Sequence, residues 1–198
     1  SAHMLWVGDR TRDVNSEHIK FISKLDNPVA VKIGPTINEN EICKIYEKIN
    51  PKNEIGKVLF ISRLGEKNID KMLPKFFSKI KYHGLEALWI CDPMHGNTIT
   101  AKNGYKTRKF KTIINELMCF FEICESENIK PSGVHFELTG ENVTECLGGI
   151  NNIKDVDLDQ RYETTCDPRL NNEQSLEIAF LIAKLLKEKG ENIEKTTH

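Results

Sequence analysis

Short apolar runs rich in β-branched residues alternate with amphipathic segments along most of this chain. The clearest runs occupy residues 29–35, 58–63, 85–90 and 134–139. Between them, apolar residues recur every three or four positions, which is the spacing of one face of a helix. Strands that are apolar throughout are typical of a parallel sheet covered on both faces. The order of the segments therefore predicts an α/β fold built from repeated strand–helix units.

The same reading predicts the remaining elements. We expect a short strand that begins at Leu5 and a further strand over 162–167. The helical spacing predicts helices over 15–25, 38–49, 68–83, 107–125 and 171–189.

A polar residue of a different kind stands in or just after five of the strand-like runs, roughly one strand–helix unit apart. These residues are Lys32, Arg63, His95, Glu137 and Asp167. In a (β/α)8 barrel the carboxyl ends of successive strands converge on one site, whereas an open doubly wound sheet would distribute these residues along an edge. The sequence therefore predicts the C-terminal portion, about five strand–helix units, of a TIM barrel, because a whole barrel needs eight strands.

Length and composition restrict the domain organisation and the partners. The chain has 198 residues, of which 39% are hydrophobic and 29% charged, and its net charge is −1. This balance indicates a soluble globular protein without a basic nucleic-acid face or a membrane anchor. We expect a tag remnant at 1–4, a partial TIM-barrel catalytic domain at 5–190 and a frayed tail at 191–198. The cysteines form no CxxC pair, which favours reduced core thiols in a cytoplasmic protein.

The polar residues at the strand ends also suggest a chemistry. His95, Glu137 and Asp167 form a mixed nitrogen and oxygen donor set that suits Mn, Fe, Co or Zn. Each of them alone would more often be a structural residue, so the prediction depends on the three together. Lys32 and Arg63 are the residue types that bind phosphate or carboxylate. The alternative for these two cations is an internal salt bridge to Glu137 or Asp167.

Four further residues have open roles. Asp9 and Arg10 follow a glycine and could add a backbone donor and a third cation. His135 lies on the same side of its strand as Glu137, either as a partner of a metal ligand or as a packed histidine. Cys91 could be a ligand, but it is better interpreted as the last core residue of its strand.

The chain resembles the class II, or plant-type, 3-deoxy-D-arabino-heptulosonate 7-phosphate (DAHP) synthases from residue 5 to about residue 187, and eight segments carry the resemblance. They are WVGDRTR (6–12), VKIGP (31–35), ISRLG (61–65), CDPMHGN (91–97), GYKTR (104–108), GVHFELTG (133–140), TECLGG (144–149) and RYETTCDPRLN (161–171). These motifs are long and rare, so the resemblance is specific.

The resemblance implies a transferase for the first step of the shikimate pathway, which supplies aromatic amino acid biosynthesis. Phosphoenolpyruvate would condense with erythrose 4-phosphate on a divalent metal, most often Mn²⁺, with Co²⁺, Fe²⁺ or Zn²⁺ as alternatives. His95, Glu137 and Asp167 would bind the metal. Asp9, Arg10, Lys32 and Arg63 would hold phosphoenolpyruvate, so that Lys32, Arg63 and His95 form the expected catalytic set.

The resemblance also implies parts that these 198 residues do not contain. Family members carry an N-terminal half with a cysteine metal ligand, another arginine for phosphoenolpyruvate and a Lys-Pro-Arg motif. A plastid-type targeting segment would also lie outside these residues. We therefore expect a homo-oligomer or association with an N-terminal half, and weak metal binding without turnover by these residues alone. The alternatives are a non-catalytic fragment that folds by association, or another metal-dependent barrel aldolase.

Overall fold

The computed structural model describes residues 4–196 and divides into two compact units. The first unit consists of residues 1–96 and 115–136, and the second of residues 97–114 and 137–198. One of the three boundaries between the units, at residues 114 and 115, falls inside a long helix over residues 110–126.

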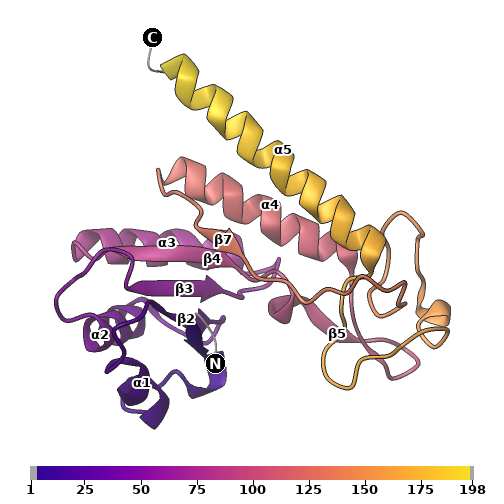
Figure 1. Cartoon of the computed structure of the whole chain (residues 1–198), viewed down its shortest axis with the longest axis horizontal. Helices are drawn as coiled ribbons and strands as arrows, with labels where there is room; N and C mark the ends of the chain where they lie inside the picture. Colours follow the sequence, from indigo (N-terminus) through magenta and orange to yellow (C-terminus); the bar gives the residue numbers. More distant parts are fainter. Residues whose placement is uncertain (1–3, 197–198) are drawn as a thin grey trace. The chain divides into compact units, whose positions relative to one another are not determined.

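The first unit contains a parallel sheet with the strand order β1-β2-β3-β4-β7 (Figure 1). The strands are β1 (Leu5–Val7), β2 (Val29–Ile33), β3 (Val58–Ser62), β4 (Ala87–Cys91) and β7 (Gly133–Val134). Neighbouring strands are parallel, and their paired residues follow one another without a bulge. Five parallel strands that alternate with helices confirm the α/β prediction and are those of part of a (β/α) barrel.

Helices connect these strands. They are α1 (Glu17–Ile22), α2 (Glu39–Ile49), α3 (Ile69–Tyr82) and α4 (Phe110–Ser126). Helix α2 begins with a capping box, because the Asn38 side chain accepts from Glu41 N and the Glu41 carboxylate accepts from Asn38 N. Helix α4 begins later than the predicted 107, because residues Lys106–Arg108 form a short strand instead.

The two faces of the sheet differ in what they bury. On the helix-covered face, Trp89 contacts Phe60 of β3 and Phe77 of α3, with ring centroids 5.3 and 4.7 Å apart. The opposite face carries a small cluster of Ala30, Leu59, Ile61 and Ile90. Because side chains alternate along a strand, Lys32 shares this face with Ala30. The Lys32 side chain therefore projects from an otherwise apolar face of the sheet.

The second unit contains much less regular structure. It includes the hairpin of β5 (Thr98–Thr100) and β6 (Lys106–Arg108), the 3₁₀ turn η3 (Asp155–Asp157) and the long helix α5 (Asn172–Thr196). The predicted strand over 162–167 is wrong, because these residues are irregular and their backbone donors bind side chains. The strand predicted over 134–139 is shorter than expected, although Leu138 forms a parallel bridge to Leu170.

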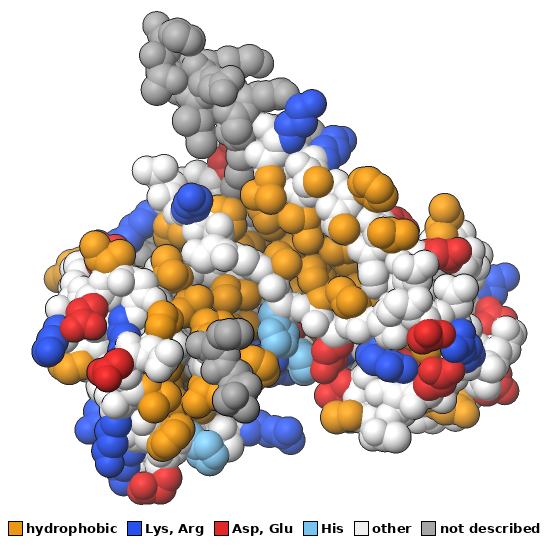
Figure 2. Space-filling model, in the orientation of Figure 1, with side chains coloured by type: hydrophobic (Ala, Val, Ile, Leu, Met, Phe, Trp, Pro, Cys, Tyr) orange, Lys and Arg blue, Asp and Glu red, His pale blue; other side chains and the backbone are white. Residues whose placement is uncertain are grey.

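The predicted ends of the chain are only partly described. The expected tag remnant at 1–4 lies outside the described residues except for Met4, which packs against the Ala30 cluster. Helix α5 runs to Thr196 and so includes most of the 191–198 tail, whose fraying stays a prediction. Among the described residues, no helix is both long and apolar enough to cross a membrane. On the face drawn in Figure 2, basic and acidic side chains are interspersed rather than gathered into one basic patch.

Candidate active site

Backbone hydrogen bonds continue beyond the strand ends in the first unit. Arg63 N donates to Ile33 O at 2.9 Å, and Asp92 N donates to Ser62 O at 2.7 Å. His135 N donates to Cys91 O at 2.8 Å. The residues that follow β3, β4 and β7 are therefore held at one edge of the sheet, as the barrel prediction requires.

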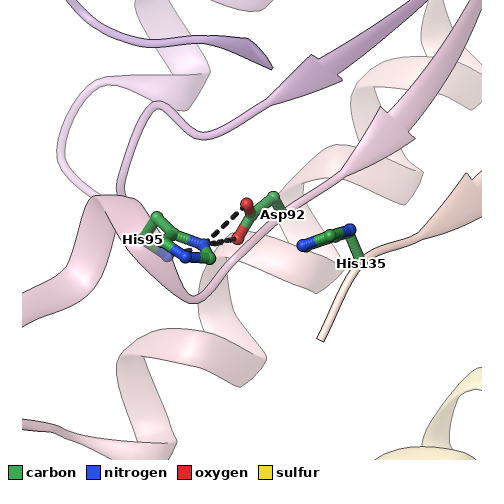
Figure 3. A group of neighbouring side chains, drawn as sticks. All are labelled: Asp92, His95 and His135. Atoms are coloured by element: carbon green, nitrogen blue, oxygen red, sulfur yellow. Dashed lines mark hydrogen bonds and ion pairs between the residues drawn. The ribbon is translucent and has the colours of Figure 1, made fainter. Parts of the chain in front are cut away.

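Lys32 is the centre of a polar cluster at this edge. Its Nζ donates to Asp92 Oδ2 at 2.9 Å. The same atom lies 3.3 Å from His135 Nε2 and 3.5 Å from His95 Nδ1. Figure 3 shows His95 and His135 on opposite sides of the Asp92 carboxylate. His135 is thus a member of the polar cluster. Its ring also packs edge-on against Trp6, with the ring centroids 5.4 Å apart.

Asp92 immediately follows the strand β4, and the sequence alone predicts no role for it. Its side chain is fully buried and also accepts from the backbone N–H groups of Met94 and His95. Burial alone would raise the pKa of this carboxyl group. The contacts of Asp92 with His95 and Lys32 outweigh that effect and hold its pKa well below the usual range. Asp92 is therefore a fixed anion that orients Lys32.

This cluster also contains a set of possible metal ligands. Donor atoms of Asp92, His95 and His135 lie within 4.8 Å of one another. However, the ammonium group of Lys32 already contacts all three side chains. A metal ion at the same point would be repelled by this cation, so the arrangement fits an anion-binding lysine better than a metal centre.

A second ion pair fixes Arg63. Asp9 Oδ2 accepts from Arg63 Nη1 at 2.8 Å, while Asp9 Oδ1 accepts from Gly34 N at 2.8 Å and from Arg12 Nε at 2.9 Å. The other arm of the guanidinium, Nη2, donates to His95 O at 2.8 Å. A Cβ atom at Gly34 would collide with Asp9 Oδ2 and Arg63 Nη1, so only glycine allows this approach.

The internal salt bridge considered for the two strand cations exists, but with other partners. Lys32 pairs with Asp92 and Arg63 with Asp9, rather than with Glu137 or Asp167. Arg10 is exposed. Arg12, for which the sequence suggests no role, is 8% exposed and pairs with Asp9. The three-residue spacing from Asp9 to Arg12 within one short turn was the available signal.

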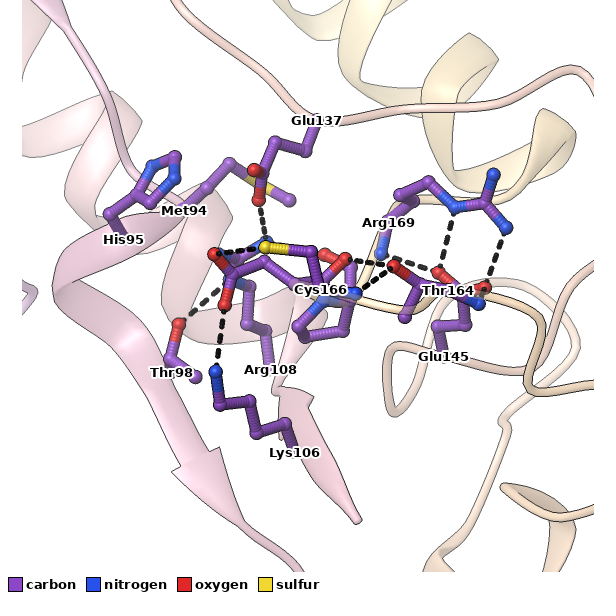
Figure 4. Close-up of polar contacts among 12 residues, drawn as sticks. Met94, His95, Thr98, Lys106, Arg108, Glu137, Glu145, Thr164, Cys166 and Arg169 are labelled. Carbon is purple, nitrogen blue, oxygen red and sulfur yellow. Dashed lines mark hydrogen bonds and ion pairs between the residues drawn. The ribbon is translucent and has the colours of Figure 1, made fainter.

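The second unit contains its own ion-pair network (Figure 4). Arg108 Nη1 donates to Glu137 Oε2 at 2.6 Å, and Lys106 Nζ donates to Asp167 Oδ1 at 3.3 Å. Carboxylate oxygens of Glu137 and Asp167 lie within 4.8 Å of one another. Their side chains are 28% and 25% exposed, so an ion can reach them from solvent.

Glu145 organises the loop that carries Asp167. Its fully buried carboxylate accepts from the backbone N–H groups of Glu163, Thr164 and Arg169, and from Nε and Nη2 of the Arg169 side chain at 3.0 and 2.7 Å. These bonds replace the ladder of a strand and explain why residues 162–167 are irregular. Burial would raise the pKa of Glu145, but its bonds with Arg169 hold the pKa below the usual value.

Comparisons with known proteins show the family of this chain. The model of the class-II DAHP synthetase family matches residues 1–183. The chain belongs to the class-II DAHP synthetase family. It is 46% identical over 188 residues to a phospho-2-dehydro-3-deoxyheptonate aldolase of Mycolicibacterium smegmatis, and 45% identical over 188 residues to one of Streptomyces coelicolor. These alignments cover 95% of this chain but 40% and 42% of the relatives, so the chain spans less than half of their length.

Membership of the DAHP synthetase family agrees with the resemblance in the motifs and leaves the individual site residues as predictions. Lys32, Arg63, His95 and Asp9 belong to the first unit, and Glu137 and Asp167 to the second. The structure contains groups of side chains that could hold a metal ion. Cys91 is fully buried and its pKa is raised well above the usual value, first by burial, so it is a core residue.

Proposed function

We propose that the protein to which this chain belongs condenses phosphoenolpyruvate with erythrose 4-phosphate to give DAHP and inorganic phosphate. This would be the first step of the shikimate pathway. The observation that carries the proposal is the match at 46% identity over 95% of the chain to a phospho-2-dehydro-3-deoxyheptonate aldolase. That coverage favours a DAHP synthase over another barrel aldolase or a non-catalytic fragment.

Phosphoenolpyruvate would bind at the edge of the first unit. It carries a carboxylate and a phosphate, which need fixed cations. Lys32 and Arg63 are such cations, and Arg10 is exposed at the same end of β1. Asp92 and Asp9 orient Lys32 and Arg63 in advance, so less conformational entropy is lost when the substrate binds.

A divalent metal ion, most often Mn²⁺ in our interpretation, would bind His95, Glu137 and Asp167. The donor set fits such an ion, because it combines an imidazole with two carboxylates whose oxygens lie within 4.8 Å of each other. The ion would supply Lewis acidity at the aldehyde carbonyl of erythrose 4-phosphate.

The reaction then requires positioning by the chain's own residues. Carbon 3 of phosphoenolpyruvate attacks the aldehyde carbon, water adds to carbon 2, and phosphate leaves from the resulting tetrahedral centre. Lys32 and Arg63 would hold the carboxylate and phosphate of phosphoenolpyruvate in register and offset their charge. Because Arg63 also binds His95 O, it connects the anion site to the loop that carries a metal ligand.

Replacement of His95 in the full-length protein tests the proposal. The variant His95→Ala should fold but should release no phosphate above background when both substrates and Mn²⁺ are present. His83→Ala is the matched control, because His83 is an exposed histidine at the end of α3 and should turn over normally. Normal turnover by His95→Ala, or a product other than DAHP from the wild type, would exclude the assignment.

A further inference from the structure

Arg108 is a buried arginine that the proposed reaction does not use. It ends β6, and its side chain is 0% exposed. Its Nε donates to Thr98 Oγ1 at 3.0 Å, and its Nη1 donates to Glu137 Oε2 at 2.6 Å. Nη1 also donates to the carbonyl oxygen of Pro168. One guanidinium group thus contacts the side chain of Glu137 and the backbone immediately after Asp167.

The cost of burying this group indicates a role other than packing. Arg108 Nη2 is buried and has no hydrogen-bond partner among the described residues. A buried donor without a partner is destabilising, and an apolar side chain of similar size would avoid that penalty. The presence of an arginine here is explained if its position serves the two carboxylates rather than the stability of the fold.

Lys106 provides an internal comparison. It lies two residues earlier on the same face of β6, and its Nζ donates to Asp167 Oδ1 at 3.3 Å. The Lys106 side chain is 58% exposed, whereas that of Arg108 is wholly buried. A flexible exposed ammonium group can move aside when a metal ion arrives, while a guanidinium group held at three points cannot.

We propose that Arg108 is a positioning residue for the metal centre, which aligns the carboxylates of Glu137 and Asp167 before the metal ion binds. This inference rests on the proposed function, since it takes these two residues as ligands. Arg108 holds the Glu137 carboxylate through Oε2, and its bond to Pro168 O fixes the backbone next to Asp167. Lys106 has the opposite effect, because its ammonium group competes with the ion for Asp167.

Metal affinity separates positioning from general stability. In the full-length protein without substrates, we expect Arg108→Lys to lower the affinity for Mn²⁺ by roughly ten- to a hundredfold, because a residue that orients metal ligands typically contributes that much. Lys106→Met should raise the affinity, because it removes the ammonium group that competes for Asp167. Calorimetric titration and the electron paramagnetic resonance signal of free Mn²⁺ both report this quantity, and thermal unfolding of the metal-free variants reports folding.

Thr98→Val provides a second variant if Arg108→Lys does not fold. It removes the bond to Arg108 Nε but keeps the guanidinium group, so it should lower the Mn²⁺ affinity by a smaller factor. The KM for phosphoenolpyruvate at saturating Mn²⁺ should stay unchanged in Thr98→Val, because the proposed binding residues of this substrate belong to the first unit. Wild-type Mn²⁺ affinity in folded Arg108→Lys, or in Thr98→Val where the first variant fails to fold, would overturn the inference.

Glu137→Gln distinguishes failure of this inference from failure of the proposed function. If Glu137→Gln binds Mn²⁺ as tightly as the wild type, Glu137 is not a ligand and the metal centre itself is wrongly assigned. If Glu137→Gln loses Mn²⁺ while Arg108→Lys binds it normally, the metal centre stands and only the role of Arg108 is refuted.

Discussion

Lys32 and Asp92 form an ion pair 2.9 Å long whose two side chains are 10% and 0% exposed. Each residue therefore provides charge compensation that water cannot supply. The pair joins strand β2 to the residue after β4 and places a cation at the edge of the sheet. Loss of either partner would leave a buried charge without compensation. Under the proposed function, the pair also holds Lys32 in place for the anionic substrate.

Removal of one member of this pair should be strongly destabilising. In the full-length protein, we expect Asp92→Ala to lower the free energy of unfolding by about 3–5 kcal/mol, because it leaves a buried ammonium group unpaired. Urea-induced unfolding measures this change. The double variant Lys32→Met with Asp92→Leu should recover most of the loss but bind no phosphoenolpyruvate. Equal instability of the single and double variants would contradict this account.

Gly34 should not tolerate a side chain. Gly34→Ala places a methyl group against Asp9 and Arg63, and we expect a loss of about 1–3 kcal/mol in stability, as for other overpacked sites. The displacement of Arg63 should also weaken binding of phosphoenolpyruvate. Gly8→Ala is the matched control, because Gly8 has a φ of −70° and its Cβ would make only an ordinary contact with Thr11. Equal effects of the two substitutions would refute the prediction.

Arg63→Lys should impair substrate binding more than folding. Arginine reaches both Asp9 and His95 O with separate nitrogens, and lysine has only one nitrogen. A hydrogen bond to a charged group contributes about 1.5–3 kcal/mol, so we expect KM for phosphoenolpyruvate to rise roughly ten- to a hundredfold. Steady-state kinetics measure this. Arg161→Lys, at an arginine whose side chain is 41% exposed and pairs with Glu141 and Glu163, should change KM little.

Glu145 should make the stability of the protein depend on pH in the acid range. Its pKa is lower in the folded protein than its ordinary value of 4.5. Its stabilising contribution is therefore complete above about pH 4.5 and is lost as the pH falls from there through the folded pKa. Unfolding in urea between pH 3 and 7 measures the slope.

Glu145→Gln should flatten this slope and lower stability at pH 7 by about 1–3 kcal/mol, because it leaves charged and backbone donors poorly paired. Glu163→Gln is the control, since the Glu163 side chain is 45% exposed and pairs with Arg161. An unchanged acid slope in Glu145→Gln would show that another carboxylate causes the effect.

The sequence by itself determined the order of strands and helices in the first unit, because apolar periodicity and caps act over a few residues. The run 58–63 folds as β3, and Asn38 with Glu41 begins α2 as its spacing predicts. The position of the polar residues at the strand ends could also be predicted, because parallel strands have their carboxyl ends at one edge of the sheet. The family could also be inferred from the sequence, because several of its motifs are the segments that follow these strands.

Only the tertiary structure decided which charges pair. Lys32 and its partner Asp92 are 60 residues apart in the sequence, and Arg63 and Asp9 are 54 residues apart. No local sequence pattern specifies a partner at such a separation. The predicted strand over 162–167 failed for the same reason. Its β-branched residues favour a strand locally, but a distant buried carboxylate, Glu145, binds their backbone donors instead. A buried charge must find compensation wherever the fold places it, and that requirement outweighs local propensity.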